Sequence, residues 1–292
     1  MKFFFALVII FFLNNCSFDN KSGIWNDETQ ISQNNQIDPE QFVDLNKLLL
    51  NNDSFNKTIK LDKNFIFKLS TPIKNLQWNN NFYNENNSLD NFKYNNSNKQ
   101  LLKTKKLSKY KNNNSILYYD QNIIFSDVRG NIIFFSIKLN KEIYKFNFYK
   151  KKFKKIEKNL NLFVKNNIIY VSDNLGYLYA LNFKSKKVVW AKNYKIPFRS
   201  NLKVEKGKIF ASNLNNDLFV FNQNSGEIVK RIPTEPIIVN NIFKNNIALN
   251  KNLLFFLNSY GSLYAVDLEN FNVKWFINLN RSSNLNPSNL FL

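Results

Sequence analysis

The chain contains no histidine, one cysteine and one methionine in 292 residues. Without histidine there is no Ser-His-Asp or Cys-His nucleophile and no histidine-ligated metal site. A single cysteine excludes a disulfide within the chain, and it equally excludes a zinc site built from cysteines alone. The commonest hydrolytic and zinc-binding arrangements are therefore excluded.

Acidic residues are also scarce, with 21 Asp and Glu against 41 Lys and Arg, for a formal charge of +20. A surplus of this size can indicate a nucleic-acid or anionic-membrane partner. Here the enrichment in Lys, Asn, Ile and Phe runs through the whole chain, and these residues have codons rich in A and T. We therefore attribute the charge to genome composition and expect no nucleic-acid partner. The 44% hydrophobic and 16% aromatic content is sufficient for a sizeable core.

The amino terminus has the pattern of an export signal. Lys2 precedes an apolar run, Phe3–Leu13, which is too short to span a bilayer, since that takes about 20 residues. The only cysteine, Cys16, follows shortly after this run. Residues 1–15 with Cys16 resemble a bacterial lipoprotein signal peptide, which implies lipidation of Cys16 and a Gram-negative source. Ser17 after the cysteine implies transfer to the outer membrane, facing the periplasm. The alternative is an ordinary secretory signal with an incidental cysteine.

Two polar segments separate this signal from the rest of the chain. Residues 16–62 form the expected tether, in which Pro39–Leu50 has apolar residues at helical spacing and predicts one short helix. Residues 63–115 form an Asn-rich lead-in whose scattered aromatic residues are expected to lie irregularly over a core surface. The remaining segment, 116–292, is expected to form the folded domain.

An internal repeat dominates that folded domain. Four segments align on Gly130, Gly176, Asn216 and Gly261, with spacings of 46, 40 and 45 residues. Each segment has two apolar strands joined by a turn at the anchor residue, then a polar turn and a strand that mostly ends in an aromatic residue. Gly or Asn at the anchor suits a hairpin turn that needs positive φ. The repeat predicts an all-β fold, a β-propeller of four-stranded blades.

Two of the segments share a longer motif. It reads Leu-Tyr-Ala-Leu-Asn at 178–182 before Trp190, and Leu-Tyr-Ala-Val-Asp at 263–267 before Trp275. This motif resembles the repeat of quinoprotein-type propellers, and both tryptophans are interpreted as blade-packing aromatics rather than ligand platforms. One group of such propellers oxidises alcohols or sugars with a bound quinone and Ca²⁺, which needs acidic residues at the propeller centre. The candidate acids are interpreted as turn residues of separate blades: Asp120, Asp127, Asp173 and Asp267.

The lipoprotein-like signal, the spacer and the repeat together resemble the BamB family of outer-membrane assembly lipoproteins. The resemblance implies a non-catalytic scaffold without catalytic, cofactor-binding or metal-binding residues. Its implied partners are BamA, the barrel subunit of the assembly machinery, and nascent outer-membrane proteins. Members have about eight blades, whereas only four align here, so an incomplete ring is expected. The alternatives are a lipoprotein propeller that binds another periplasmic protein or a glycan, and a quinone-dependent dehydrogenase.

Basic residues on the blade loops supply the candidate binding positions. Arg129, Arg199 and Arg231 fall on separate blade loops and are candidates for a protein interface. The run Lys150–Lys155 holds five lysines around one phenylalanine. We interpret it as a solvated loop, with contact to anionic lipid or lipopolysaccharide as the alternative.

Overall fold

The regular secondary structure of the described part of the chain is almost entirely β-strand. The computed structural model describes residues 65–66, 68–74, 77–96, 99–100, 102–232, 234–235 and 243–279. The predicted signal, Cys16 and the helix expected at Pro39–Leu50 lie outside these residues. Within them no helix is long and apolar enough to cross a membrane.

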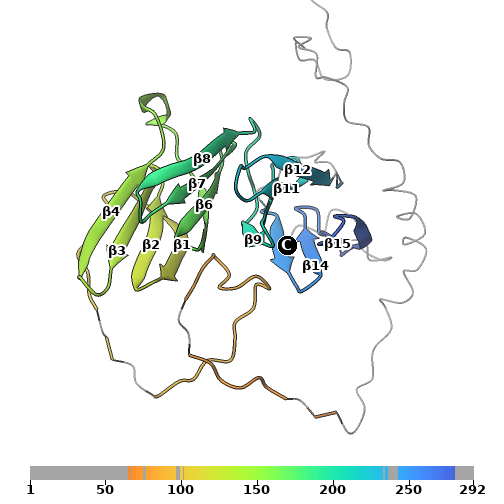
Figure 1. Cartoon of the computed structure of the whole chain (residues 1–292), viewed down its shortest axis with the longest axis horizontal. Helices are drawn as coiled ribbons and strands as arrows, with labels where there is room; N and C mark the ends of the chain where they lie inside the picture. Colours follow the sequence, from red (N-terminus) through yellow and green to blue (C-terminus); the bar gives the residue numbers. More distant parts are fainter. Residues whose placement is uncertain are drawn as a thin grey trace, which may run out of the picture. The chain divides into compact units, whose positions relative to one another are not determined.

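Sixteen strands of this part form four sheets, each an antiparallel meander of four consecutive strands (Figure 1). Blade 1 comprises β1 (Asn112–Tyr119), β2 (Asn122–Asp127), β3 (Asn131–Ser136) and β4 (Lys141–Asn147). Blade 2 comprises β5 (Leu160–Lys165), β6 (Ile168–Asp173), β7 (Tyr177–Asn182) and β8 (Lys187–Asn193). Blade 3 comprises β9 (Lys203–Glu205), β10 (Lys208–Ser212), β11 (Leu218–Asn222) and β12 (Ile228–Ile232). Blade 4 comprises β13 (Asn246–Leu249), β14 (Leu253–Leu257), β15 (Ser262–Asp267) and β16 (Val273–Asn278).

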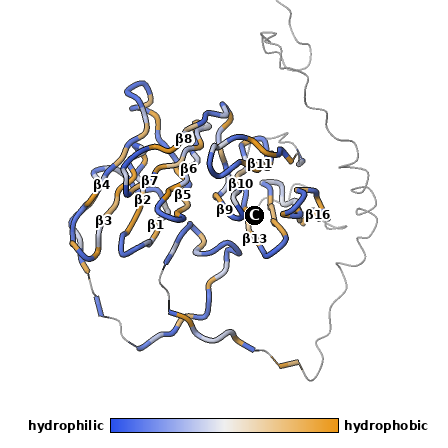
Figure 2. The backbone as a smooth tube through the Cα atoms, viewed as in Figure 1, coloured by the Kyte–Doolittle hydropathy of each residue, from blue (hydrophilic) through white to orange (hydrophobic). Residues whose placement is uncertain are grey.

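The middle strands are runs of β-branched and aromatic residues, which suit a sheet covered on both faces. Figure 2 shows these apolar runs alternating with polar turns along the tube. The predicted anchors occupy the turns between the second and third strands. Their φ angles are +83° at Gly130 and Gly176, +68° at Asn216 and +79° at Gly261. The prediction of positive φ at these four positions is confirmed.

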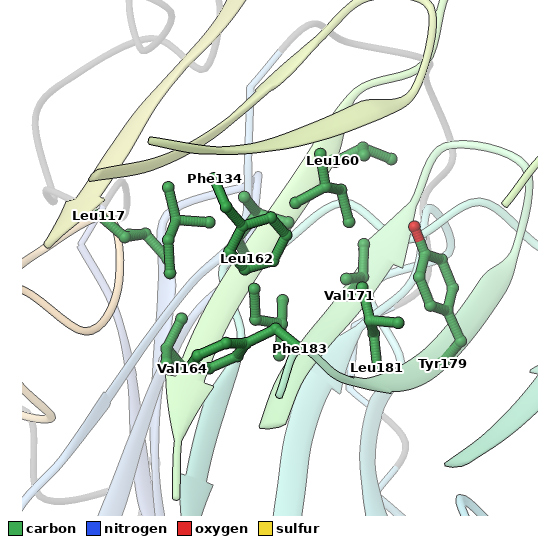
Figure 3. Close-up of a cluster of buried hydrophobic side chains, with 12 residues drawn as sticks. Leu117, Phe134, Leu160, Leu162, Val164, Val171, Tyr179, Leu181 and Phe183 are labelled. Carbon is green, nitrogen blue, oxygen red and sulfur yellow. The ribbon is translucent and has the colours of Figure 1, made fainter. Parts of the chain in front are cut away.

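The blades stack face to face in chain order. Leu117 and Phe134 of blade 1 pack with Leu162, Val171 and other residues of blade 2 in one buried cluster (Figure 3). A second cluster joins blades 2 and 3, and a third joins blades 3 and 4. The innermost strands β1, β5, β9 and β13 contact one another in succession. This is the arrangement of β-propeller blades around an axis, so the predicted fold class is confirmed.

The outermost strand of every blade has an irregularity at the same place. The register between the third and fourth strands shifts by one residue in each sheet. The extra residues are Ile143, Val189, Val229 and Lys274. A bulge twists an edge strand and interrupts its row of hydrogen-bonding groups, which opposes the addition of a further strand.

The Asn-rich lead-in has a definite role at the propeller axis. We call residues 78–87 the strap, because they pass over the inner strands in order. Trp78 exchanges two backbone hydrogen bonds with Tyr118 of β1, at 2.7 and 3.0 Å, and the Asn79 carbonyl accepts one from Val164 of β5 at 2.9 Å. Farther along, the Glu85 carbonyl accepts a bond from Leu249 of β13 at 2.8 Å. The expectation of an irregular covering was incomplete, since the strap bonds edge groups of the inner strands.

Trp190 confirms the interpretation of a blade-packing aromatic. It extends from β8 of blade 2 over the β11–β12 turn of blade 3, where its Nε1 donates to the Gln223 carbonyl at 3.1 Å. The ring also covers Gly226, which has a φ of +73°. Trp275 of blade 4 lies beside Phe255, with ring centroids 6.0 Å apart.

We predict that Gly226→Ala lowers the free energy of unfolding by about 2 kcal/mol, since it adds a left-handed backbone penalty and displaces the indole. A Cβ at this position would lie 2.5 Å from the Trp190 ring. Gly207→Ala is the matched control, because Gly207 has a φ of +72° and open space around it. Urea unfolding of both variants separates the two effects. Equal losses in the two variants would contradict the packing role of Trp190.

Candidate functional site

One end of the propeller carries the longer connections between blades. This loop face consists of the turns between second and third strands (128–130, 174–176, 213–217 and 258–261) and the described residues of the inter-blade connections (148–159, 194–202, 234–235 and 243–245). The other end carries the shorter turns within blades. Long loops on a rigid scaffold are the usual carriers of binding residues, so the loop face is the candidate functional surface.

A side-chain carboxylate or amide organises each turn of the loop face. The residues are Asp127, Asp173, Asn213 and Asn258 in blades 1 to 4. In every case one Oδ1 accepts two backbone N–H groups from the turn, at 2.8 to 3.1 Å. The interpretation of Asp127 and Asp173 as turn residues is thereby confirmed. These hydrogen bonds hold the backbone of the turns in one conformation. The other side chains of the turns remain available to contact a partner.

The two other candidate acids also belong to turns. Asp120 follows β1 with a φ of +48°, and Asp267 accepts bonds from the backbone of Glu269 and Asn270. Hydrogen bonds from this turn and the neighbouring Lys274 ammonium lower the pKa of Asp267, although desolvation opposes them. Among the described residues no group of three or more Asp, Glu, His or Cys side chains converges on a point where a metal ion could bind.

Arg129 and Arg199 lie in loops of the loop face, whereas Arg231 lies within strand β12 near that face, so its predicted place on a blade loop was wrong. Arg231 donates from Nη2 to both carboxylate oxygens of Asp217, at 3.0 and 3.1 Å, so it ties together neighbouring strands of blade 3. Arg129 donates to the Lys154 carbonyl, and its guanidinium stacks over Tyr110. Arg199 lies in the connection that leads into blade 3, where its backbone N–H donates to the Ser212 carbonyl. Burial lowers the pKa of its guanidinium.

The run Lys150–Lys155 occupies the connection between blades 1 and 2, where Lys151–Phe153 form the short 3-10 helix η3. Four of its lysines line a pocket of about 580 Å³ beside the turn that holds Arg129. All five lysines of the run are exposed, so the interpretation as a solvated loop is confirmed, and four of them also form a pocket wall. Sequence reasoning missed Tyr110, Tyr149 and Lys158, which line the same pocket. The one available signal was the aromatic and basic character of residues 144–158.

Buried charged groups support the wall of this pocket. The Tyr149 hydroxyl donates to Asp173 Oδ2 at 2.5 Å, and burial raises the pKa of both side chains. Lys158 is almost fully buried and donates its ammonium to the Phe153 carbonyl. Burial and then the neighbouring Arg129 lower the pKa of Lys158. Hydrogen bonds in the interior therefore hold Tyr149 and Lys158 of the pocket wall in place.

Comparison with known proteins gives partial structural alignments at 9 to 14% sequence identity. No family model matches the chain, and no curated protein matches it. A crystal structure of BamB from Moraxella catarrhalis aligns with a TM-score of 0.47 at 14% identity, covering 56% of this chain and 47% of that one. The computationally designed Ika4 protein aligns with a TM-score of 0.48 at 9% identity, covering 59% and 99%. The chain thus spans about half the length of the BamB structure.

Proposed function

We propose that the protein is a non-catalytic lipoprotein scaffold of the outer membrane, which binds BamA and assists insertion of outer-membrane proteins. The observation that carries the proposal is the combination, in one chain, of a lipoprotein-like signal ending at Cys16 with a rigid propeller. Three acyl chains on the cysteine would anchor the chain stably at the membrane surface. The polar residues that follow would let the propeller reach partners in the periplasm.

The loop face is the proposed contact surface for this partner. Its turns are fixed by the buried Asp and Asn side chains, so a partner would meet a largely preorganised surface. Arginine is enriched in protein interfaces, and three of the chain's arginines lie at this end. The outer strands are less suited to receive a strand from a partner, because each has a bulge.

The test is affinity purification of the lipidated chain from detergent-solubilised outer membranes, followed by mass spectrometry. We expect BamA to be recovered. Cys16→Ser should move the protein to the soluble periplasmic fraction and reduce BamA recovery, since anchoring raises the local concentration of the partners. A folded, membrane-bound chain that recovers no BamA would contradict the proposal.

A pair of exposed lysines tests the contact surface itself. Lys195 lies in the loop-face connection between blades 2 and 3, whereas Lys184 lies in the β7–β8 turn at the opposite end. Lys195→Glu should reduce BamA recovery, and Lys184→Glu, with the same change in charge, should not. The opposite ranking would place the interface on the other end of the propeller.

A further inference from the structure

The pocket between blades 1 and 2 is strongly basic, and the proposed scaffold role does not account for this charge. Its lining contains ten residues, of which six are cationic and none is acidic. The cations are Arg129, Lys150, Lys151, Lys154, Lys155 and Lys158. Like charges at this density repel one another, and the Debye length of about 8 Å at physiological salt screens them only in part. An anionic ligand would remove this repulsion.

Hydrogen bonds and a cation–π contact with neutral groups position one wall of the pocket. Arg129 Nη1 donates to the Lys154 carbonyl at 2.5 Å, and its guanidinium lies 5.3 Å from the centre of the Tyr110 ring. Asn147 Nδ2 donates to Asn131 Oδ1 at 2.9 Å and to the Arg129 carbonyl at 3.1 Å. Both contacts of the Arg129 guanidinium, with the Lys154 carbonyl and the Tyr110 ring, are with neutral groups. Its positive charge is therefore not paired with a carboxylate.

The opposite wall is equally well defined. The Lys158 ammonium lies 5.2 Å from the centre of the Tyr149 ring and donates to the Phe153 carbonyl. The Tyr149 ring in turn lies against Gly130, where a Cβ would come within 2.4 Å of it. Since Lys158 and Tyr149 are already held in place, these two side chains lose little conformational entropy when a ligand binds.

Among the described residues no carboxylate lines the pocket, and none forms an ion pair with its lysines. The ion pairs among the described residues join Lys165 to Glu205, Arg231 to Asp217 and Lys274 to Asp267. Asp127 and Asp173 lie behind the wall, where backbone N–H groups and side-chain donors occupy their oxygens. The four lysines of the connection therefore face the pocket without a carboxylate partner on its lining.

We propose that this pocket binds a ligand that carries two or more phosphate groups. Four lysine charges balance two phosphomonoesters of about −2 each. Lysine and arginine are the ordinary ligands of phosphate oxygens, and Asn147 and the two tyrosines suit the polar and apolar parts of an attached sugar or glycerol. A volume of about 580 Å³ exceeds what one inorganic phosphate fills. The ligand is either a membrane lipid headgroup or a soluble phosphorylated molecule.

Site-resolved lysine modification distinguishes these sources. The detergent-solubilised full chain is treated with an amine-reactive reagent, with and without pyrophosphate, and each lysine is followed by mass spectrometry. The second arm uses the full chain in phosphatidylcholine vesicles with and without cardiolipin, which has two phosphates. We expect Lys151, Lys154 and Lys155 to be protected at least about fivefold more than Lys187 and Lys192 on the exposed strand β8.

Protection by pyrophosphate indicates a soluble ligand, and protection only in cardiolipin vesicles indicates a lipid headgroup. The double variant Lys154→Glu/Lys155→Glu should weaken pyrophosphate binding, measured by calorimetry, about tenfold or more. Lys187→Glu/Lys192→Glu changes the net charge equally and should bind as the unmodified chain does. Unchanged urea midpoints show that both variants are folded. Absent protection, uniform protection of all lysines, or equal weakening in both variants would overturn the proposal.

Discussion

Asp173→Ala should lower the free energy of unfolding by about 3–5 kcal/mol, because it leaves several buried hydrogen-bond donors without an acceptor. Asp173 is fully buried in the loop-face turn of blade 2. Its Oδ1 accepts the N–H groups of Leu175 and Tyr177, both at 2.8 Å, and its Oδ2 accepts the Tyr149 hydroxyl at 2.5 Å. Each donor left unpaired in the interior costs about 1–3 kcal/mol. Urea unfolding followed by tryptophan fluorescence measures the loss.

The chain itself supplies the control for this variant. Blades 3 and 4 carry Asn213 and Asn258 at the equivalent position, and their Oδ1 atoms make the same two backbone bonds. Asp173→Asn keeps this acceptor, so we expect a loss of about 1 kcal/mol or less. If alanine and asparagine destabilise the protein equally, the turn does not depend on the side-chain acceptor.

The free energy of unfolding should rise by about 3 kcal/mol between about pH 6 and about pH 9, because of the buried Lys203. Burial lowers the pKa of its ammonium from 10.5 to about 7, with Glu85 opposing the shift. Between these values the unfolded chain keeps the proton that the folded chain has released, so stability increases with pH. Below about pH 7 the cost of burying the charge is present in full. The chain has no histidine to add a transition in this range.

Lys203→Met tests the assignment by removing the titrating group while keeping most of its buried volume. We expect the pH-dependent rise to shrink markedly in this variant, leaving a smaller contribution from Lys158, whose pKa is also lowered. Lys192→Met, on the exposed strand β8, should keep the full rise. The measurement is urea unfolding at a series of pH values in a common ionic strength. An unchanged slope in Lys203→Met would refute the prediction.

The repeat was predictable because its signals are local. Apolar strands, polar turns and a positive-φ residue recur together, and Gly176 or Gly261 at the turn between strands follows directly from backbone sterics. The innermost strands were harder to delimit from the sequence. β9 has only three residues, Lys203–Glu205, and it begins with a buried lysine that no hydrophobic pattern would place in a core.

The strap and the basic pocket could not be predicted for a different reason. The strap contacts strands far away in the sequence, and the pocket joins several loops without a regular repeat, so neither periodicity nor spacing brings their residues together. In the strap, Asn87 bonds to Asn246 and Ile247, which lie 159 and 160 residues away. In the pocket, Tyr110 stacks on Arg129, which in turn bonds to Lys154. Asn and Lys are abundant throughout the chain. Composition therefore does not distinguish the Asn and Lys residues of the strap and the pocket from the others.

The strap also has a kinetic consequence. Its residues are synthesised before any blade, yet its partners include Lys203, whose ammonium donates to the Asn84 carbonyl at 2.6 Å, and Leu249 in the last blade. Contacts of such high sequence separation are slow to form, because closing a long loop loses chain entropy before any contact compensates. We therefore expect the meanders to form first, each from local hairpins, and the strap to dock in a late step. Until it docks, the inner edges of the blades remain open to chaperones or to the wrong strand.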